Sequence, residues 1–250
     1  MNLFFRSNTE YLPYIQILVS IITGLVLMFD FSGLGLLASV VIYAFIGCFG
    51  ISIGYHRYLA HKSFELKYKW MKYPLFWLGC IAGTGSPLGW AAVHRNHHKF
   101  SDRVGDPHSP KNIGLKVLLA DYEYKLNPWN VRDFVCDKTH MFLHNYYFLL
   151  LFIWFAGAML IGFNVAMYGV IVPIAFTIWV STISNYVNHK FGYISNKTQD
   201  DSRNLWITAV LTFGEGWHNN HHANPRDYQF GKKWWEIDWG AFIIKNALMK

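Results

Sequence analysis

The stretch Gly214-Glu215-Gly216-Trp217-His218-Asn219-Asn220-His221-His222 contains the spacing His-x-x-His-His. An earlier stretch, His94-Arg95-Asn96-His97-His98, repeats that spacing about 120 residues before it. On an α-helix the spacing places three imidazoles on one face, because residues three and four apart are neighbours there. Imidazole binds zinc, copper, iron and nickel, so the repeated spacing predicts a metal site without naming the metal.

Two further clusters bring nine of the twelve histidines together in the sequence. His56 and His61 come directly after an apolar run, and His189 follows another. On an α-helix, a spacing of five residues places His61 about 7–8 Å farther along the axis than His56 and rotates it away. These two histidines therefore need not bind one ion in the same way.

Composition places the chain among membrane proteins. With 53% hydrophobic and 18% aromatic residues over 250 positions, it is too apolar for an ordinary soluble domain. A membrane-spanning helix needs roughly 20 mostly apolar residues, and the stretches that approach this length are 11–29, 34–54, 146–162 and 165–187. Short connectors at 30–33 and 163–164 predict two helical hairpins. The expected fold class is all-α, with four transmembrane helices.

The distribution of charge predicts the orientation in the membrane. No lysine or arginine lies in 7–55 or in 139–189. By the positive-inside rule, both termini and the segments 55–140 and 188–250 face the cytoplasm, where these segments form a helical cap on a multi-pass membrane protein. All nine clustered histidines fall in this cap. The net charge of +7 favours anionic lipid headgroups or an acidic partner protein, and we do not expect nucleic acid to bind.

The apolar stretch 74–93 does not fit a simple membrane span. It is interrupted by Gly79, Gly83, Gly85, Pro87 and Gly89. Lipid-exposed spans rarely contain so many breaks, so we expect this segment to lie at the interface or to dip into the membrane and return. The segment 111–138 is expected to be partly helical. The tail 232–250, which has aromatic residues among lysines, is expected to form an amphipathic interfacial helix.

Several motifs resemble those of the integral-membrane fatty acid desaturases, in particular the Δ9 acyl-CoA and acyl-lipid (stearoyl-CoA desaturase-like) branch in its compact bacterial form. They are His56-x-x-x-x-His61, His94-x-x-His97-His98, Asp106-Pro107-His108-Ser109-Pro110, Asn185-x-x-x-His189, Gly214-Glu215-Gly216-Trp217-His218-x-x-His221-His222 and Trp235-Glu236-Ile237-Asp238. The histidine motifs alone would also suit hydroxylases or ketolases. The Asp-Pro-His-Ser-Pro and Gly-Glu-Gly-Trp elements favour the Δ9 branch.

The resemblance implies one desaturase domain over 1–250, which introduces a cis double bond, at Δ9, into a saturated acyl chain. It implies dioxygen as co-substrate and a centre of two iron ions whose ligands are His56, His61, His94, His97, His98, His189, His218, His221 and His222, with Asn185 acting through a water. Carboxylate-rich di-iron bundles use two Glu-x-x-His pairs, and this chain has only Glu215 to His218. We expect Glu215 to orient a ligand imidazole instead.

The three remaining histidines and two other functions complete the interpretation. We expect His108 to serve in a turn or to support a ligand, and His140 and His144, which lack partners in the sequence pattern, to lie at the membrane interface.

One alternative function is a membrane di-iron acyl or alkane hydroxylase, whose product is an alcohol. A more remote alternative is a non-enzymatic membrane metal carrier, but the four apolar runs contain none of the ionisable residues that would form its path.

The head group of the substrate and the electron donor are less well defined by the sequence. Ala92-Val93 stands where the resemblance leads us to expect the Arg-Asp pair of the animal stearoyl-CoA enzymes, so acyl chains linked to lipid, CoA or carrier protein all stay open. We expect no fused electron-donor domain, because neither the short segment before the first apolar run nor anything after Lys250 could hold a haem. Electrons are therefore expected from a separate ferredoxin or b-type cytochrome with its reductase. Acyl chain length, exact double-bond position and oligomeric state are not determined by these residues.

Overall fold

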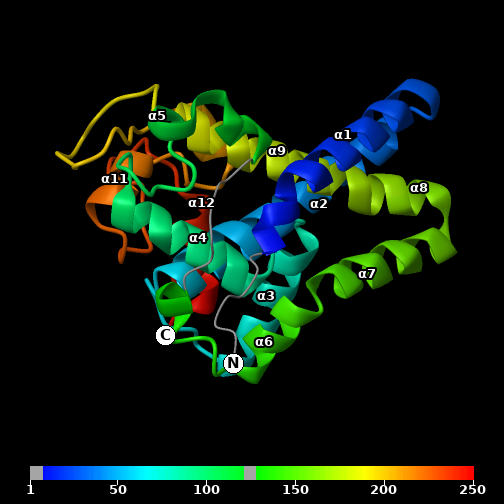
Figure 1. Ribbon diagram of the computed structural model, residues 1–250, viewed down its shortest axis with the longest axis horizontal. Coiled ribbons are helices and arrows are strands. Elements are labelled where there is room, and N and C mark those ends of the chain that lie inside the picture. Colours follow the sequence, from blue (N-terminus) through cyan, green and yellow to red (C-terminus); the bar gives the residue numbers. More distant parts are fainter. Residues whose placement is uncertain (1–7, 121–127) are drawn as a thin grey trace.

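The computed structural model describes residues 8–120 and 128–250, which form helices joined by turns (Figure 1). The elements in chain order are η1 (Asn8–Tyr11), α1 (Leu12–Phe29), α2 (Gly33–Phe45), η2 (Ile46–Ala60), η3 (Lys69–Met71), α3 (Lys72–Ile81), α4 (Pro87–Phe100), α5 (Pro110–Ile113), η4 (Gly114–Leu119), η5 (Pro128–Val131), α6 (Lys138–Asn145), α7 (Tyr147–Ile161), α8 (Phe163–Ala166), η6 (Met167–Ile171), α9 (Val172–Val187), α10 (Trp206–Leu211), α11 (His218–Ala223), α12 (Trp239–Ile243) and η7 (Ile244–Leu248). The elements η2, η6 and η7 are π-helices. The described residues form no β-strand, which confirms the all-helical class.

Three helices are long and apolar enough to cross a membrane. They are α1, the continuous helix α2–η2 (Gly33–Ala60) and the continuous helix α8–η6–α9 (Phe163–Val187). Large apolar side chains project from their outer faces, as at Leu18 and Leu37, which are 58% and 60% exposed. Contiguous apolar surface of this kind is unfavourable in water, so these helices suit a lipid environment.

The third apolar run forms a shorter helix than expected. α7 contains 15 residues, which at 1.5 Å per residue gives about 22 Å, less than the roughly 30 Å of a hydrocarbon core. It has the length of a span only together with α6, from which it is bent by 67°. The topology of four spans therefore stays a prediction. The expected connector 163–164 was wrong, because the backbone is extended at Gly162 and α8 begins at the next residue.

The long helices pack together, and hydrogen bonds of Tyr168 in η6 stabilise the turn between α1 and α2. Its hydroxyl donates to the carbonyl of Asp30 (2.7 Å) and accepts from the backbone N–H of Ser32 (2.9 Å). A Cβ at Gly35 of α2 would lie 2.6 Å from the Tyr168 ring, so only glycine allows this close approach. α1, α7 and α9 share one apolar core around this contact.

The interrupted apolar stretch 74–93 forms two helices, α3 and α4. The turn between them has positive φ at Gly83 (80°) and Gly85 (108°), a conformation that glycine adopts without strain. Ser86 then caps α4 by accepting from the backbone N–H of Gly89 (3.2 Å). The glycine-rich interruption therefore separates two helices, and α4 carries the second histidine cluster. The placement of this segment at or within the membrane stays a prediction.

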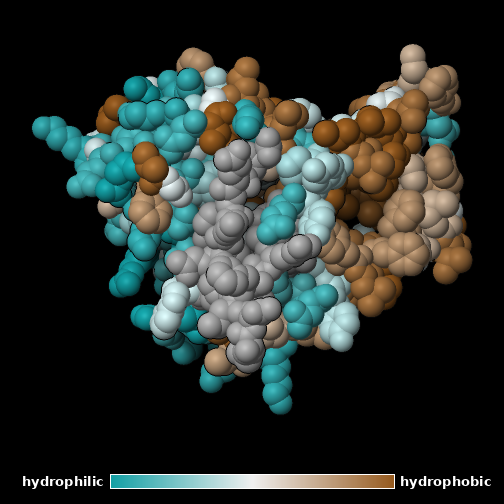
Figure 2. Space-filling view, in the orientation of Figure 1, coloured by the Kyte–Doolittle hydropathy of each residue, from teal (hydrophilic) through white to brown (hydrophobic). Residues whose placement is uncertain are grey.

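Hydrophilic and apolar side chains occupy different ends of the molecule. Apolar residues cover α1, α7 and α8, whereas hydrophilic residues gather over α4, α5 and α11 (Figures 1 and 2). Segment 111–138 is partly helical where it is described, as expected, and 121–127 lie outside the described residues. The tail ends in the short helix α12–η7, on which Trp239 and Phe242 are exposed and Ala241 is buried.

Candidate metal centre

The structure brings together all nine histidines that the sequence analysis singled out. They lie at the end of η2, along α4, just after α9 and on α11. The first histidine group comprises His56, His61, His94, His98 and His221. The second histidine group comprises His97, His189, His218 and His222. Within each group, the nitrogens able to bind a metal lie within 4.8 Å of one another.

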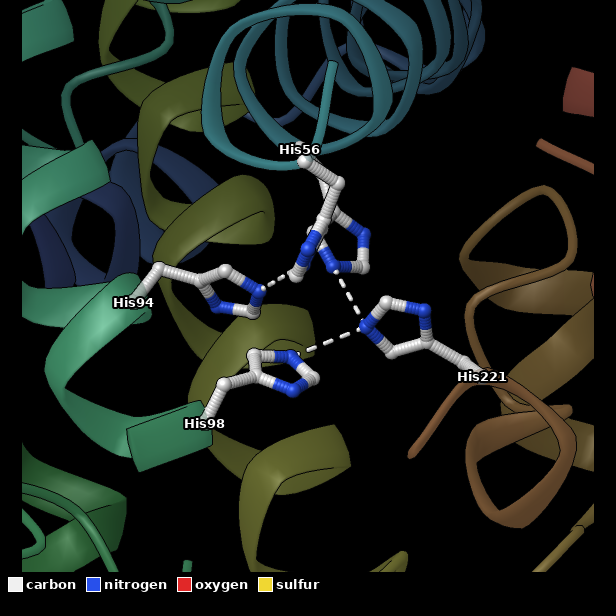
Figure 3. Close-up of side chains that lie close together, drawn as sticks. His56, His94, His98 and His221 are labelled. Atoms are coloured by element: carbon white, nitrogen blue, oxygen red, sulfur yellow. Dashed lines mark hydrogen bonds between the residues drawn. The ribbon is translucent and has the colours of Figure 1, made fainter. Parts of the chain in front are cut away.

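In the first histidine group, the Nε2 atoms face one another. They are 2.8 Å apart between His61 and His94, 3.0 Å between His56 and His221, and 3.0 Å between His98 and His221. Figure 3 shows His56, His94, His98 and His221 pointing toward a common centre. A neutral imidazole has a single N–H, so lone pairs that converge in this way are poorly satisfied by each other. A metal ion at the centre would satisfy them together.

The second histidine group also has nitrogens that need a partner. His189 and His218 place their Nε2 atoms 3.0 Å apart. The Nε2 atoms of His97 and His222 are buried and form no hydrogen bond with the described residues. A buried polar atom without a partner is unfavourable, so the donor set fits a metal ion here as well.

A π-helical turn brings His56 and His61 into the same group. The backbone N–H of His61 donates to the carbonyl of His56 (3.1 Å), which is the i to i+5 bond of a π-helix. Residues five apart therefore lie one above the other, and the two ring centres are 4.8 Å apart. The expectation that the spacing rotates His61 away was wrong, because it assumed 3.6 residues per turn.

Three aspartates accept hydrogen bonds from the Nδ1 atoms of the second group. The pairs are Asp106 with His97 (2.9 Å), Asp102 with His189 (2.8 Å) and Asp200 with His222 (2.8 Å). An ionised carboxylate only accepts hydrogen bonds, so each Nδ1 carries the proton and each Nε2 keeps its lone pair. Such partners fix the ring orientation and increase the basicity of the free nitrogen, as they do for metal-bound histidines.

Burial and hydrogen bonding set the protonation of this site. Burial would raise the pKa of Asp102, but the hydrogen bond from His189 and further hydrogen bonds outweigh it and hold the pKa at about 2. Burial raises the pKa of Asp106 to about 6, against the hydrogen bonds from two backbone N–H groups. Burial, with neighbouring imidazoles adding to it, lowers the pKa of His97 well below 6.5. The imidazole is therefore neutral, the form that binds metals.

Glu215 contacts His56, as expected of a residue that orients an imidazole. Its carboxylate accepts hydrogen bonds from His56 Nδ1 and from Arg57, and from the hydroxyl of Ser52 at 2.5 Å. Arg57 is fully buried, and its Nη2 pairs with the carboxylate of Asp238 (3.0 Å). The Trp-Glu-Ile-Asp motif near the C-terminus is therefore connected to the first histidine group through two ion pairs.

The glycines beside Glu215 allow α11 to pack closely. Gly214 has φ +112°, and a Cβ there would lie 2.2 Å from the carboxylate of the C-terminal motif. A Cβ at Gly216 would lie 2.1 Å from the backbone nitrogen of Ala209. Asn220, between the histidines of α11, donates to the carboxylate of Glu236 (2.9 Å). These contacts fix the helix that carries three of the nine histidines.

One cavity reaches both histidine groups. It contains about 1040 Å³ of space not filled by atoms, including its open mouth, and its lining includes His56, His94 and His218. Its apolar walls include Tyr43, Ile51, Trp90, Ile178 and Phe213. Asn185, four residues before His189, also lines this cavity. A water held by Asn185 would therefore lie in the space that both groups border.

His108 lies closer to the site than a turn residue would. It lines the same cavity and stacks on His97, with the ring centres 4.1 Å apart. Together with Asp106 and His97 it forms a third set of possible ligand atoms. Its expected role in support of a ligand fits this contact.

His140 and His144 are buried within the protein and have partners that the sequence pattern did not show, whereas their position at the membrane interface stays a prediction. They are only 4% and 6% exposed. His140 packs against the rings of Phe76 and Phe134, and Nδ1 of His144 lies 2.7 Å from the hydroxyl of Ser86. The reason is that α6 packs against α4 and turns these side chains inward.

The sequence analysis missed several partners of the histidines. Asp102 lies in the polar turn directly after the histidines of α4, and that proximity was a usable signal. Arg57 follows the first clustered histidine and ends an apolar run, which also indicated a buried partner. Asp200 lies in the loop after α9 and has no spacing relation to its partner on α11, so the sequence offered no signal for it.

A helical protein with long apolar helices and two buried histidine groups is compatible with a metal site in a membrane protein. Residues 31–238 match the family model for fatty acid desaturase, and the chain belongs to that family. It is 35% identical over 239 residues to the sn-1 stearoyl-lipid 9-desaturase of Synechocystis sp., a match that covers 91% of this chain and 73% of the relative.

Other relatives agree on the reaction but differ in substrate and position. The sn-2 palmitoyl-lipid 9-desaturase of Nostoc sp. is 34% identical over 262 residues, covering 97% of this chain and 90% of the relative. The acyl-CoA 5-desaturase AL21 of Anemone leveillei is 35% identical over 227 residues, covering 87% and 70%. The chain is therefore a fatty acyl desaturase, an oxidoreductase of lipid metabolism.

Proposed function

We propose that this desaturase forms a cis double bond at the Δ9 position of a saturated acyl chain on a membrane lipid. The reaction consumes one dioxygen, two electrons and two protons, and converts –CH2–CH2– to –CH=CH– with release of two water molecules. The observation that carries the proposal is the cavity, since its lining joins apolar walls to histidines of both groups. An acyl chain in this cavity would have methylene groups beside the metal centre.

We propose two iron ions as the resident metals, with the nine histidines as ligands and Asn185 acting through a water. Support comes from the convergence of the imidazoles and from the buried nitrogens that need a partner. Imidazole donors do not by themselves select iron over zinc or copper, so the choice of iron rests on the family. When bound, the irons supply an oxidant able to remove hydrogen from an unactivated methylene.

The residues of the chain then orient the site and exclude water. The carboxylates on the histidine Nδ1 atoms hold each ring with its free nitrogen toward the metal position. The apolar cavity walls would hold the methylene chain, and the bound chain would exclude water from the metal position and so prevent side reactions.

The head group is proposed to be a lipid. Ala92 and Val93 are buried apolar residues, and Val93 lines the cavity, so this position offers no charged pair for the phosphates of CoA. The relatives from Synechocystis and Nostoc are named for lipid-linked acyl chains. An acyl-CoA relative also exists, so both linkages belong in the test.

We propose a multi-pass membrane protein with both ends, the segments 55–140 and 188–250 and the metal centre on the cytoplasmic side. Lysine and arginine are confined to those regions, which supports this orientation. The separation of apolar and hydrophilic ends in Figure 2 fits a protein half embedded in lipid.

The test is expression in a host without its own desaturase, followed by mass spectrometry of lipid-linked, CoA-linked and carrier-linked acyl chains. We expect a new Δ9 double bond in lipid-linked chains and about two irons per purified chain. A double bond at another position would overturn the Δ9 assignment, and unsaturation confined to acyl-CoA would overturn the lipid linkage. An alcohol as main product would favour the hydroxylase alternative. The metal-carrier alternative is not supported, given the family.

A further inference from the structure

The turn between α3 and α4 forms part of the cavity wall. Thr84 in this turn lines the cavity, and so do Trp90, Val93 and His94 on the helix that follows. Trp90 also stacks on His94, with the ring centres 4.8 Å apart. Thr84 precedes the helix, so its distance from the histidines depends on the conformation of the turn.

Two glycines leave this turn free to adopt more than one conformation. Gly83 and Gly85 both have positive φ, and glycine adopts positive and negative φ about equally readily. The turn therefore needs contacts with its surroundings to hold one conformation. One such contact is with α9, because a Cβ at Gly83 would lie 2.5 Å from the side chain of Ile174.

A second set of contacts holds the turn through polar groups. The backbone N–H of Gly85 donates to the hydroxyl of Tyr147 (2.9 Å), and its carbonyl accepts from the hydroxyl of Tyr55 (3.3 Å). Nδ1 of His144 lies 2.7 Å from the hydroxyl of Ser86, which caps α4. We call Tyr55, Tyr147 and His144 the polar clamp.

The polar clamp is buried outside the cavity. Its side chains are at most 6% exposed. Within residues 8–120 and 128–250, none of them lines the cavity. His144 and Tyr147 lie on α6 and α7, which pack against α4 and α3 respectively (Figure 1). These two residues therefore act on a bound acyl chain through the turn.

We propose that Tyr147 and His144 are positioning residues that set which pair of methylene groups lies at the metal centre. The proposal rests on the proposed function, because it concerns the register of an acyl chain in the cavity. The hydroxyl of Tyr147 and the imidazole of His144 fix the turn, and the turn fixes the wall at Thr84. A wall held in one place gives one register and one double-bond position. A turn that adopts a second conformation allows a second register and a neighbouring double-bond isomer.

The test locates double bonds by mass spectrometry in the lipids of a host without its own desaturase. Tyr147→Phe removes one hydroxyl and leaves the buried N–H of Gly85 without its acceptor. His144→Phe removes the imidazole nitrogens. The matched control is His140→Phe, since His140 lies on the same helix, is 4% exposed and packs against two phenylalanines. The ratio of isomers is measured in the product, so it does not depend on how much enzyme folds.

We expect isomers displaced from the main position to increase their share roughly 5–100-fold in Tyr147→Phe. This is the factor by which loss of one buried hydrogen-bond partner favours a displaced turn. His144→Phe should shift the ratio in the same direction. His144→Asn, whose amide keeps a hydrogen-bonding atom near the position of Nδ1, should restore most of the single position. His140→Phe should lower thermal stability and keep the isomer ratio of the unmodified enzyme.

Two outcomes would overturn the positioning proposal. One is an unchanged isomer ratio in Tyr147→Phe and His144→Phe with only a lower unfolding temperature, which would make the polar clamp a stability element. The other is an equal shift in His140→Phe, which would mean that any loosening of this core displaces the acyl chain. Both outcomes leave the proposed function intact, because the unmodified enzyme still desaturates. Absence of any new double bond with the unmodified enzyme would instead refute the proposed function.

Discussion

Replacement of Asp106 by asparagine should weaken metal binding more than it weakens the fold. The buried carboxylate accepts from His97 Nδ1 (2.9 Å) and from the backbone N–H groups of Asp102 (2.8 Å) and His108 (3.1 Å). Asparagine has the same shape but offers one accepting oxygen and one donating nitrogen. If its NH2 faces His97, the proton of that ring must move to Nε2, which then cannot bind a metal.

The alternative orientations of the amide are also unfavourable. If the NH2 faces a backbone N–H, that buried donor loses its acceptor, at a cost of about 1–3 kcal/mol. Loss of a carboxylate partner lowers metal affinity roughly 10–100-fold, which corresponds to about 1.4–2.8 kcal/mol of binding free energy. We therefore expect Asp106→Asn to bind iron more weakly by that factor and to lose turnover in proportion.

The assay measures iron per chain during titration with a chelator, the rate of desaturation and the temperature of thermal unfolding. The control is Asp201→Asn, the same chemical change at a carboxylate that is 51% exposed and pairs with a surface lysine. The control should match the unmodified enzyme in all three measurements. Iron affinity and rate within twofold of the unmodified enzyme in Asp106→Asn would refute the tautomer argument.

Three further predictions concern the ligands, the topology and the water. His97→Ala should remove most turnover and bound iron, whereas His140→Ala, which removes a ring packed outside both groups, should lower thermal stability and keep the rate per iron. Full desaturation by the first variant would contradict the ligand assignment. Tags at both chain ends should be accessible from the cytoplasm and a tag at Ser32 should not, and ends on opposite sides would contradict the orientation. Asn185→Ala should keep most of its iron but desaturate roughly 10–100-fold more slowly; a normal rate per iron with lower stability would mean that this residue only joins helices.

Features confined to one segment could be predicted from the sequence. The apolar runs located α1 and the continuous helix α8–η6–α9 within two residues, because hydrophobicity is a property of the segment itself. The run 34–54 ended six residues before the end of α2–η2. Histidine spacing identified all nine members of the two groups. The division into groups was not predicted, because the spacing was expected to place three imidazoles on one face, whereas adjacent residues on a helix point about 100° apart. His97 and His98 accordingly belong to different groups.

Features that depend on packing between segments could not be predicted. The π-helical η2 lies against α3 so closely that a Cβ at Gly50 would be 2.6 Å from the backbone nitrogen of Gly79. The spacing between His56 and His61 does not contain this information, and the α-helical assumption therefore failed. The pairing of Asp200 with His222 likewise joins the loop after α9 to helix α11, and the distance between them is set by the whole fold.

The buried charges explain why the fold and the metal centre depend on each other. The chain has a net charge of +7, yet Asp102, Asp106, Asp200 and Glu215 are largely buried behind the histidines. Arg57 is the one lysine or arginine that is buried in the described part of the chain, and Glu215 shares it with a second carboxylate. Buried anions without compensating charge are unfavourable, and cations at the centre would remove that cost. Three of these carboxylates contact the second histidine group and Glu215 contacts the first, so the second group has more negative charge around it.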